Sequence, residues 1–171
     1  ADFGRIGQTP KTSWRNCNLY EFFTNWLAVP VFLDTDVTAA AYGEVTWGAG
    51  GGCRSVLYVT VGTGIGVGVL IDGRPVHGLL HPEAGHIRVP RAPDDNFDGT
   101  CFYHHDCVEG LAAGPAIIQR WGKKLTELPS EHVAYEETAH YLARLVVIAV
   151  LLISPEKIIM GGGVMSNLEL F

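Results

Sequence analysis

Apolar residues recur with helical spacing in several stretches of the chain. Between residues 19 and 27 they fall at positions i, i+3, i+4, i+7 and i+8, which is typical of an amphipathic helix. The alanine-rich start of 37–47 also favours a helix, and another is predicted over 108–121 with a restart at Pro115. A longer helix, 135–152, is apolar nearly all round in its second half, so we expect it in the core.

Short apolar runs bounded by turn residues predict strands. The stretch 55–61 alternates between apolar and polar positions, and 65–71 follows it as the second strand of a hairpin. A third strand is expected at 74–77, after an Asp-Gly turn. Two further short strands are predicted at 31–33 and 157–160.

Length and charge limit the kinds of partner. The 171 residues can bury one good core, or form one domain with part of another. The net charge of −6 argues against nucleic acid as the main partner, so we expect a small neutral or phosphorylated ligand. The longest apolar run, 145–153, is too short to span a bilayer, so no membrane partner is expected.

The N-terminus and the cysteines favour a reducing compartment. Residues 1–4 lack the basic start and the apolar region of a signal peptide. Without a secretory feature, cysteines that fall in a metal-like spacing are better explained by metal binding than by disulfides. We therefore expect a cytoplasmic protein in which Cys17 and Cys53 are plain thiols.

The 21 glycines are concentrated in a few places, which predicts turns and close approach of the backbone to a ligand. The run 48–52 is typical of a flexible linker. We place a domain boundary there. It separates residues 1–52, the remainder of a first lobe, from residues 53–171, a second lobe.

Two glycine motifs are candidates for ligand binding. Gly62-Thr63-Gly64 lies between two predicted strands, where it can present backbone N–H groups and a hydroxyl to a phosphate. A plain glycine-rich hairpin is the alternative. The triple glycine 161–163 follows a predicted strand and allows a flat ligand to lie against the backbone, although a flexible turn has the same composition.

Asp36 lies between the predicted strand 31–33 and the predicted helix 37–47. A carboxylate at this position can cap the helix by accepting backbone N–H groups. It can also be a general base that the end of a strand delivers to a cleft. The two interpretations are compatible, because Asp34 or Thr35 is also able to cap the helix.

The segment 81–109 crowds metal-ligating side chains into a loop-like stretch. Cys101, His104 and Cys107 form a Cys-x-x-His-x-x-Cys run, and His86 upstream is the natural fourth ligand. Two thiolates and two imidazoles suit Zn²⁺ in a closed tetrahedral site. The sequence therefore predicts structural zinc.

Two alternatives to this structural zinc site concern the choice of ligands and a catalytic role for the metal. His81 and His105 are also available as ligands, so the thiolates are the firmer half of the set. A zinc hydrolase would need an open coordination position with a base beside it. Glu83, three residues before the ligand His86, is the candidate for that base. Four protein ligands would close the site, which argues against hydrolysis.

Taken in order, these motifs resemble the ROK family of bacterial sugar kinases, and within it the fructokinase-like branch. The motifs that carry the resemblance are residues 35–37 with 39–44, 60–66, 81–86, 101–110 and 159–164. The resemblance implies an α/β, actin-like ATPase (ribonuclease H-like) fold with two lobes and a sugar in the cleft between them. Family members begin with an Asp-x-Gly-Gly-Thr phosphate loop and continue past the triple glycine, so we expect a chain incomplete at both ends.

The resemblance also implies roles for the site residues. Asp36 corresponds to the base that takes a proton from the sugar hydroxyl as it attacks the γ-phosphate of ATP, which binds with Mg²⁺. Glu83 and Glu109 correspond to ligands of sugar hydroxyls, and His86 to a zinc ligand that also lies beside the sugar.

The nucleotide contacts follow from the same resemblance. Gly62, Thr63 and Gly64 correspond to the second phosphate loop, and Gly162 with Gly163 to the motif on the adenosine side. Branch members carry Cys-Pro-x-His-Gly-Asp-Cys, whereas residues 101–107 of this chain lack the proline and the glycine.

The leading hypothesis is therefore an ATP-dependent hexose kinase, fructose being the expected substrate and a homodimer the expected assembly. The alternative is a zinc-stapled sugar-binding module that lacks phosphotransfer. The family also includes transcriptional repressors, but their N-terminal helix-turn-helix is not visible in this sequence.

Overall fold

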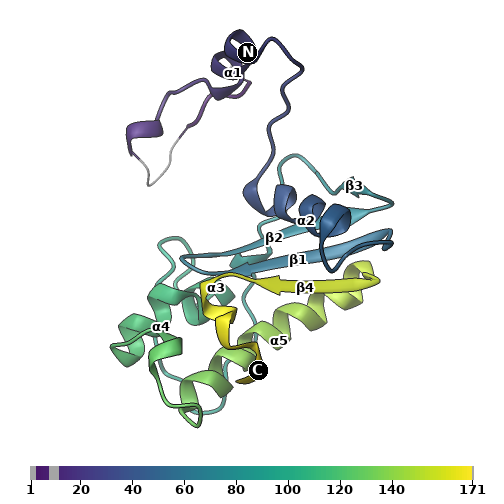
Figure 1. The fold of residues 1–171 in the computed structure, drawn as a ribbon. Helices are drawn as coiled ribbons and strands as arrows, with labels where there is room; N and C mark the ends of the chain where they lie inside the picture. Colours follow the sequence, from purple (N-terminus) through teal and green to yellow (C-terminus); the bar gives the residue numbers. More distant parts are fainter. Residues whose placement is uncertain (1–2, 8–11, 171) are drawn as a thin grey trace. The chain divides into compact units, whose positions relative to one another are not determined.

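A computed structural model describes residues 3–7 and 12–170 of the chain. They divide into two compact units, Ala1–Thr35 and Asp36–Phe171 (Figure 1). The predicted boundary at 48–52 lies inside the second unit, where Ala49 N–H donates to Glu44 Oε2 (2.9 Å) and closes a turn after helix α2. The assignment of these parts to two kinase lobes stays a prediction.

The first unit contains the short 3₁₀ helix η1 (Thr12–Trp14) and helix α1 (Leu19–Leu27), which confirms the helix predicted from apolar spacing. Asn18 caps α1, because its side-chain oxygen accepts the N–H of Glu21 at 3.1 Å. The prediction of a strand at 31–33 is wrong. This stretch pairs with no described strand, and Phe32 is 90% exposed, so a short apolar run without a partner stays irregular.

A mixed sheet in the order β3-β2-β1-β4 forms the middle of the second unit, as far as its described residues go. Its strands are β1 (Ser55–Val61), β2 (Ile65–Ile71), β3 (Arg74–Pro75) and β4 (Lys157–Gly161). Strands β1 and β2 form the predicted antiparallel hairpin, while β1 and β4 run parallel with Thr60 opposite Gly161. The carboxyl ends of β1 and β4 are therefore neighbours, so the Gly62-Thr63-Gly64 turn and the triple glycine meet at one edge.

Helices cover both faces of this sheet (Figure 1). Helix α2 (Asp36–Trp47) lies on one face, and the other carries α3 (Val108–Ala112), α4 (Gly114–Trp121) and α5 (Val133–Ile153). The shorter 3₁₀ helices are η2 (Ala84–His86), η3 (Leu125–Glu127) and η4 (Gly163–Leu170). Within the described residues, every helix is too short or too polar to cross a membrane.

The predicted helices of this unit are confirmed as helices. The expectation that the apolar second half of α5 lies in the core is wrong, because its buried residues end at Leu145, and Leu151 and Leu152 are 79% and 75% exposed. The restart predicted within 108–121 is confirmed, because the stretch forms α3 and α4, divided at Ala113, and Pro115 occupies the first turn of the second helix. The buried side of α5 packs with β1, β2 and α3 into one apolar core that includes Leu57, Val67, Leu111 and Leu145.

Helix α2 approaches β2 so closely that only glycine fits beneath it. A Cβ atom at Gly68 would lie 2.2 Å from the carbonyl oxygen of Val37, and one at Gly66 would lie 2.7 Å from Val37 Cγ1. Both glycines lie on the same face of the strand, since side chains alternate along it. Val37, the residue after Asp36, therefore rests against β2 at these two glycines.

Candidate functional site

The structure gathers the four predicted metal ligands. The ligand atoms of His86, Cys101, His104 and Cys107 all lie within 4.8 Å of one another. His86 Nδ1 is 3.5 Å from Cys101 Sγ and 3.6 Å from Cys107 Sγ. Zn²⁺ with bonds of about 2.0 to 2.3 Å makes a tetrahedron with edges of about 3.3 to 3.8 Å. The cluster therefore fits a tetrahedral metal ion.

A tight turn brings these ligands together. Cys101 and His105 exchange backbone hydrogen bonds of 2.9 and 3.3 Å, and His105 adopts the left-handed backbone conformation (φ 55°) where branch members carry glycine. Gly99 and Gly110 let the chain pass close by, since Cβ atoms there would lie 2.1 and 1.8 Å from the His105 carbonyl oxygen. Cys107 then caps α3 through its sulfur, which accepts the N–H of Gly110 at 3.4 Å.

Burial favours the neutral form of the Cys107 thiol. Desolvation, with a smaller contribution from neighbouring Cys101, raises the pKa of the Cys107 thiol to about 11. Without a metal the thiol is therefore protonated at neutral pH, and a metal must displace the proton to bind. The alternative ligands His81 and His105 do not belong to the cluster; His81 Nε2 lies 2.8 Å from Glu83 Oε1 instead.

Glu109 connects the metal cluster to the β1–β2 turn. Its Oε2 accepts a hydrogen bond from the N–H of Ile65 at 3.0 Å, and its Oε1 lies 3.9 Å from His86 Nδ1. Gly64 is small enough to admit this carboxylate, because a Cβ atom there would lie 2.6 Å from Glu109 Oε2. One carboxylate oxygen of Glu109, a predicted sugar ligand, is thus already hydrogen-bonded to the protein. Glu83, the other predicted carboxylate ligand, is hydrogen-bonded to His81 through its Oε1.

Asp36 begins helix α2, one residue before the Val37 that rests on β2. It is exposed, and its Oδ1 accepts the N–H of Val37 at 2.9 Å. Val37 covers Gly66, the residue after the Ile65 whose N–H Glu109 accepts. Asp36 is the first helical residue, which leaves both the capping and the general-base interpretation open.

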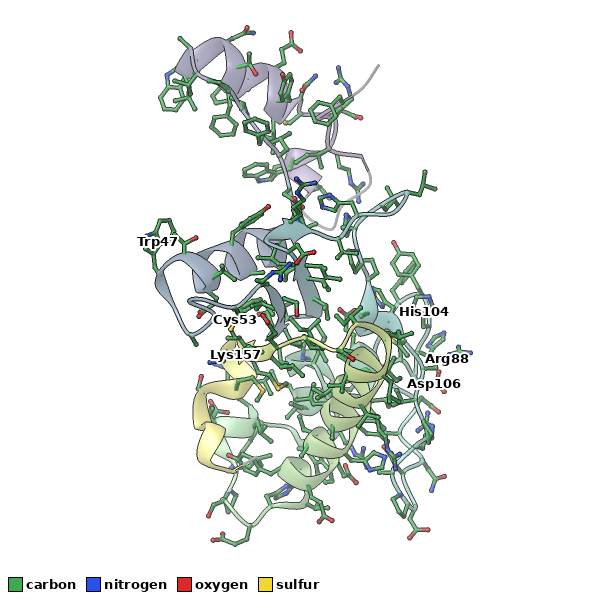
Figure 2. All side chains as sticks on the ribbon, turned by 90° about the vertical axis from the view of Figure 1, so that its right-hand side faces the viewer. Trp47, Cys53, Arg88, His104, Asp106 and Lys157 are labelled. Atoms are coloured by element: carbon green, nitrogen blue, oxygen red, sulfur yellow. The ribbon has the colours of Figure 1, made fainter. Side chains whose placement is uncertain are left out.

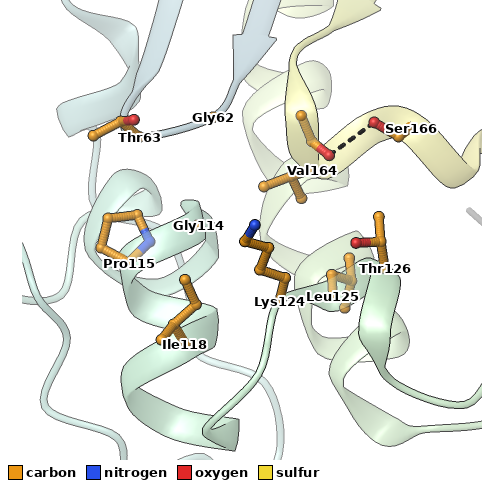
Figure 3. Close-up of a pocket in the computed structure, with 11 residues that line it drawn as sticks. Gly62, Thr63, Gly114, Pro115, Ile118, Lys124, Leu125, Thr126, Val164 and Ser166 are labelled. Carbon is orange, nitrogen blue, oxygen red and sulfur yellow. Dashed lines mark hydrogen bonds between the residues drawn. The ribbon is translucent and has the colours of Figure 1, made fainter.

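A cavity of about 540 Å³ opens at the glycine-rich edge of the sheet (Figure 3). It is lined by the β1–β2 turn, the first half of α4, the segment entering η3 and the start of η4. Of the predicted nucleotide contacts, Gly62, Thr63 and Gly163 line it, whereas Gly64 and Gly162 do not. At Gly162 the backbone itself requires glycine, because φ is 98° and a Cβ atom would have no room beside the carbonyl oxygen of Val61.

Sequence analysis missed most of this cavity's lining. Pro115 and Ile118 come from α4, Lys124 and Thr126 from the segment around η3, and Ser166 from η4. Only Pro115 carried a signal, as the predicted restart of a helix. The volume lies in the range of small-molecule sites, which are about 300 to 1,000 Å³.

A buried ionic network, also missed, supports the loop that carries the metal ligands. Arg120 of α4 contacts the buried Asp95 (Nη1–Oδ2, 3.0 Å) and Glu137 of α5 (Nη2–Oε1, 2.8 Å). Although burial raises the pKa of Asp95, hydrogen bonds from Tyr141, the Phe97 N–H and Arg120 outweigh it and hold the pKa below its ordinary value. Burial raises the pKa of Glu137, with Arg120 opposing the shift.

The network continues to the metal ligands themselves. Arg91 Nη2 lies 3.7 Å from Asp106 Oδ2, and Arg88 Nε lies 2.9 Å from Asp106 Oδ1. Arg88 also donates to the carbonyl oxygen of His104 at 3.0 Å, and Figure 2 shows Arg88, His104 and Asp106 together on the surface of this loop. The loop is therefore tied both to the helices and to its own metal-binding turn.

Comparison with known proteins gives a consistent picture. A fructokinase of Zymomonas mobilis subsp. mobilis (strain ATCC 31821 / ZM4 / CP4) is 52% identical over 166 residues, 95% of this chain and 55% of that protein. A solved ROK hexokinase from Thermus thermophilus has a TM-score of 0.75 at 29% identity, covering 90% of this chain and 55% of that one. A ROK family glucokinase from Streptomyces griseus, solved in complex with glucose and AMPPNP, has a TM-score of 0.64 at 28% identity, covering 89% and 58%.

These matches confirm the predicted fold class. The structural neighbours are ROK sugar kinases with the actin-like ATPase fold, to which the mixed sheet of this chain corresponds. The chain spans a little more than half the length of the curated relatives that it matches. A family model described as "ROK family" matches residues 1–171, and the chain therefore belongs to the ROK family.

Proposed function

We propose that this chain provides the nucleotide cavity and part of the sugar site of an ATP-dependent hexose kinase, with fructose as the substrate and fructose 6-phosphate as the product. One observation carries the proposal. The cavity at Gly62 and Thr63 belongs to the same turn that holds the Glu109 carboxylate at the Ile65 N–H, so a nucleotide site and a site for polar hydroxyls share one turn. Similarity to the Zymomonas fructokinase supports fructose among the hexoses.

Phosphoryl transfer makes modest demands on the protein, because positioning and charge stabilisation account for most of the catalysis. Asp36, exposed at the start of α2, takes the proton from the 6-hydroxyl of fructose. The oxygen forms a bond to the γ-phosphorus while the bond to the β-phosphate oxygen breaks and ADP leaves. Mg²⁺ that enters with ATP neutralises the charge that develops on the phosphates.

The sugar ligands are Glu83, His86 and Glu109. Since Glu109 Oε2 is held by the Ile65 N–H, its Oε1 is the oxygen left to accept a sugar hydroxyl, beside His86. This bond fixes the carboxylate in one orientation before any sugar arrives, which lowers the cost of binding. Glu83 is held in a similar way by His81, at 2.8 Å.

Zn²⁺ is proposed as a structural ion held by His86, Cys101, His104 and Cys107. When bound, it fixes the loop that delivers His86 and Glu109 to the sugar. Four protein ligands leave it no open position for catalysis. The cytoplasmic location and the homodimer expected from the sequence stay predictions.

The test is to incubate the chain with ATP, Mg²⁺ and fructose and to measure ADP, with glucose and mannose as competing substrates. Asp36→Asn should lower turnover by about a hundredfold or more, because general bases contribute about 10² to 10⁴ in rate. It should leave fructose affinity within a few-fold, and Asp34→Asn, an exposed carboxylate two residues away, is the matched control. Fructose binding without ADP would favour the sugar-binding module instead, and an active Asp36→Asn protein would rule out the base.

A further inference from the structure

Among the described residues that line the 540 Å³ cavity, Lys124 is the one with a charged side chain. The other lining residues are glycine, proline, aliphatic residues, threonine and serine. Figure 3 shows the Lys124 amine directed away from η3 into the space between Gly114 and Val164. Both Lys123 and Lys124 are exposed, but only Lys124 is among the described residues that line the cavity.

The local backbone holds Lys124 in this position. Gly122 reverses the chain after α4 in a left-handed conformation (φ 73°), and its N–H donates to the Ile118 carbonyl oxygen at 2.8 Å. Lys124 N–H then donates to Glu127 Oε2 at 3.1 Å, while Glu127 N–H donates to the Lys124 carbonyl oxygen at 3.0 Å. The next residue, Leu125, is buried, so the backbone from which the Lys124 side chain extends is held in place.

The rest of the cavity wall favours an anion. The N-terminal end of α4 opens onto it, and Gly114 N–H donates to the Gly62 carbonyl oxygen at 2.8 Å, which joins this helix end to the predicted phosphate turn. Helix N-termini carry a partial positive charge. No carboxylate is among the described residues that line the cavity.

We propose that Lys124 binds the phosphate chain of the nucleotide and so makes the site discriminate by phosphate content. The inference rests on the proposed kinase function and adds a specificity-determining residue to it. A cation opposite a helix N-terminus and a Gly-Thr-Gly turn gives the phosphates donors from more than one side of the cavity. Adenosine, which lacks phosphate, gains nothing from the charge.

Calorimetric titration of ADP and of adenosine into the chain tests the proposal. Lys124→Met should weaken ADP binding by about tenfold to a hundredfold, which corresponds to about 1.4 to 2.7 kcal/mol, and should change adenosine binding by less than about threefold. Lys124→Arg should restore most of the ADP affinity, because it keeps the charge. Lys123→Met is the matched control and should bind both ligands as the wild type does.

Other outcomes separate the possible failures. Equal losses for ADP and adenosine in Lys124→Met would mean that the side chain contacts the nucleoside or shapes the cavity, and unchanged ADP binding would mean that it makes no contact. Either result overturns the inference while leaving the nucleotide site in place. A wild-type chain that binds neither ligand would refute the nucleotide site itself, and thermal melts of each variant exclude loss of folding.

Discussion

The close approach of α2 to β2 makes a quantitative prediction about Gly68. In Gly68→Ala, the added Cβ atom would lie 2.2 Å from the Val37 carbonyl oxygen and 2.6 Å from the Val37 carbonyl carbon. Non-bonded heavy atoms in van der Waals contact lie about 3.5 Å apart, so α2 must move by about 1 Å to admit the methyl group. Overpacking of this kind costs about 1 to 3 kcal/mol.

Gly43 in the same helix provides the matched control. It has nothing within 4 Å of a built Cβ atom, so Gly43→Ala adds a better helix former without a clash. That substitution should stabilise the chain by about 0.5 to 1 kcal/mol. The two Gly→Ala variants are therefore expected to differ by about 1.5 to 4 kcal/mol in unfolding free energy, with opposite signs relative to the wild type.

Urea unfolding followed by far-ultraviolet circular dichroism measures this difference, and the rate of ADP release with fructose and ATP gives a second readout. Because α2 carries Asp36 at its first turn, a shift of the helix should also displace that carboxylate. A displacement of about 1 Å in a catalytic group can cost about a hundredfold in rate. If Gly68→Ala unfolded at the same urea concentration as the wild type, α2 would not rest on the backbone of β2.

Further predictions concern the metal loop and the buried network. Removing metal with a chelator should lower the melting temperature by about 5 °C or more and weaken fructose binding, and added Zn²⁺ should restore both; unchanged values would contradict the structural role. His105→Gly should stabilise the chain by about 0.5 to 1 kcal/mol in urea unfolding, since φ is 55°, whereas Phe102→Gly in the same turn should not. Asp95→Asn should cost about 3 kcal/mol by leaving Arg120 without its buried partner. The pKa of Asp95 is lowered on folding, so its contribution is present above the unfolded pKa of about 4 and lost as pH falls through the folded value. The wild type should therefore lose more stability than Asp95→Asn on acidification, and parallel pH curves would refute the assignment.

Local sequence patterns were enough to predict most of the elements. The hairpin of β1 and β2, helix α1, and the Cys101 to Cys107 turn each depend on neighbours close in sequence, so spacing alone identifies them. The segment 31–33 failed for the converse reason. An apolar run becomes a strand only when another strand pairs with it, and that information lies outside the run.

The missed parts of the site depend on contacts that are distant in sequence. Arg120 meets Asp95 across 25 positions and Glu137 across 17, and neither pairing leaves a pattern in the chain. Lys124 resembles Lys123 in every local respect, and only the reversal at Gly122 decides which of them faces the cavity. Composition identifies candidate charges, whereas topology selects among them.

Glu109 shows why a metal can matter to a site in which it does no chemistry. It follows Cys107 by two residues, at the start of α3, so whatever fixes Cys107 also fixes the direction of this carboxylate. Its Oε2 accepts the Ile65 N–H just after the Gly62-Thr63-Gly64 turn, and its Oε1 lies 3.9 Å from His86 Nδ1. Disorder in the metal loop would therefore disturb the sugar ligands and the start of β2 together. Because one carboxylate serves both, we expect metal loss to weaken sugar and nucleotide binding in the same chain.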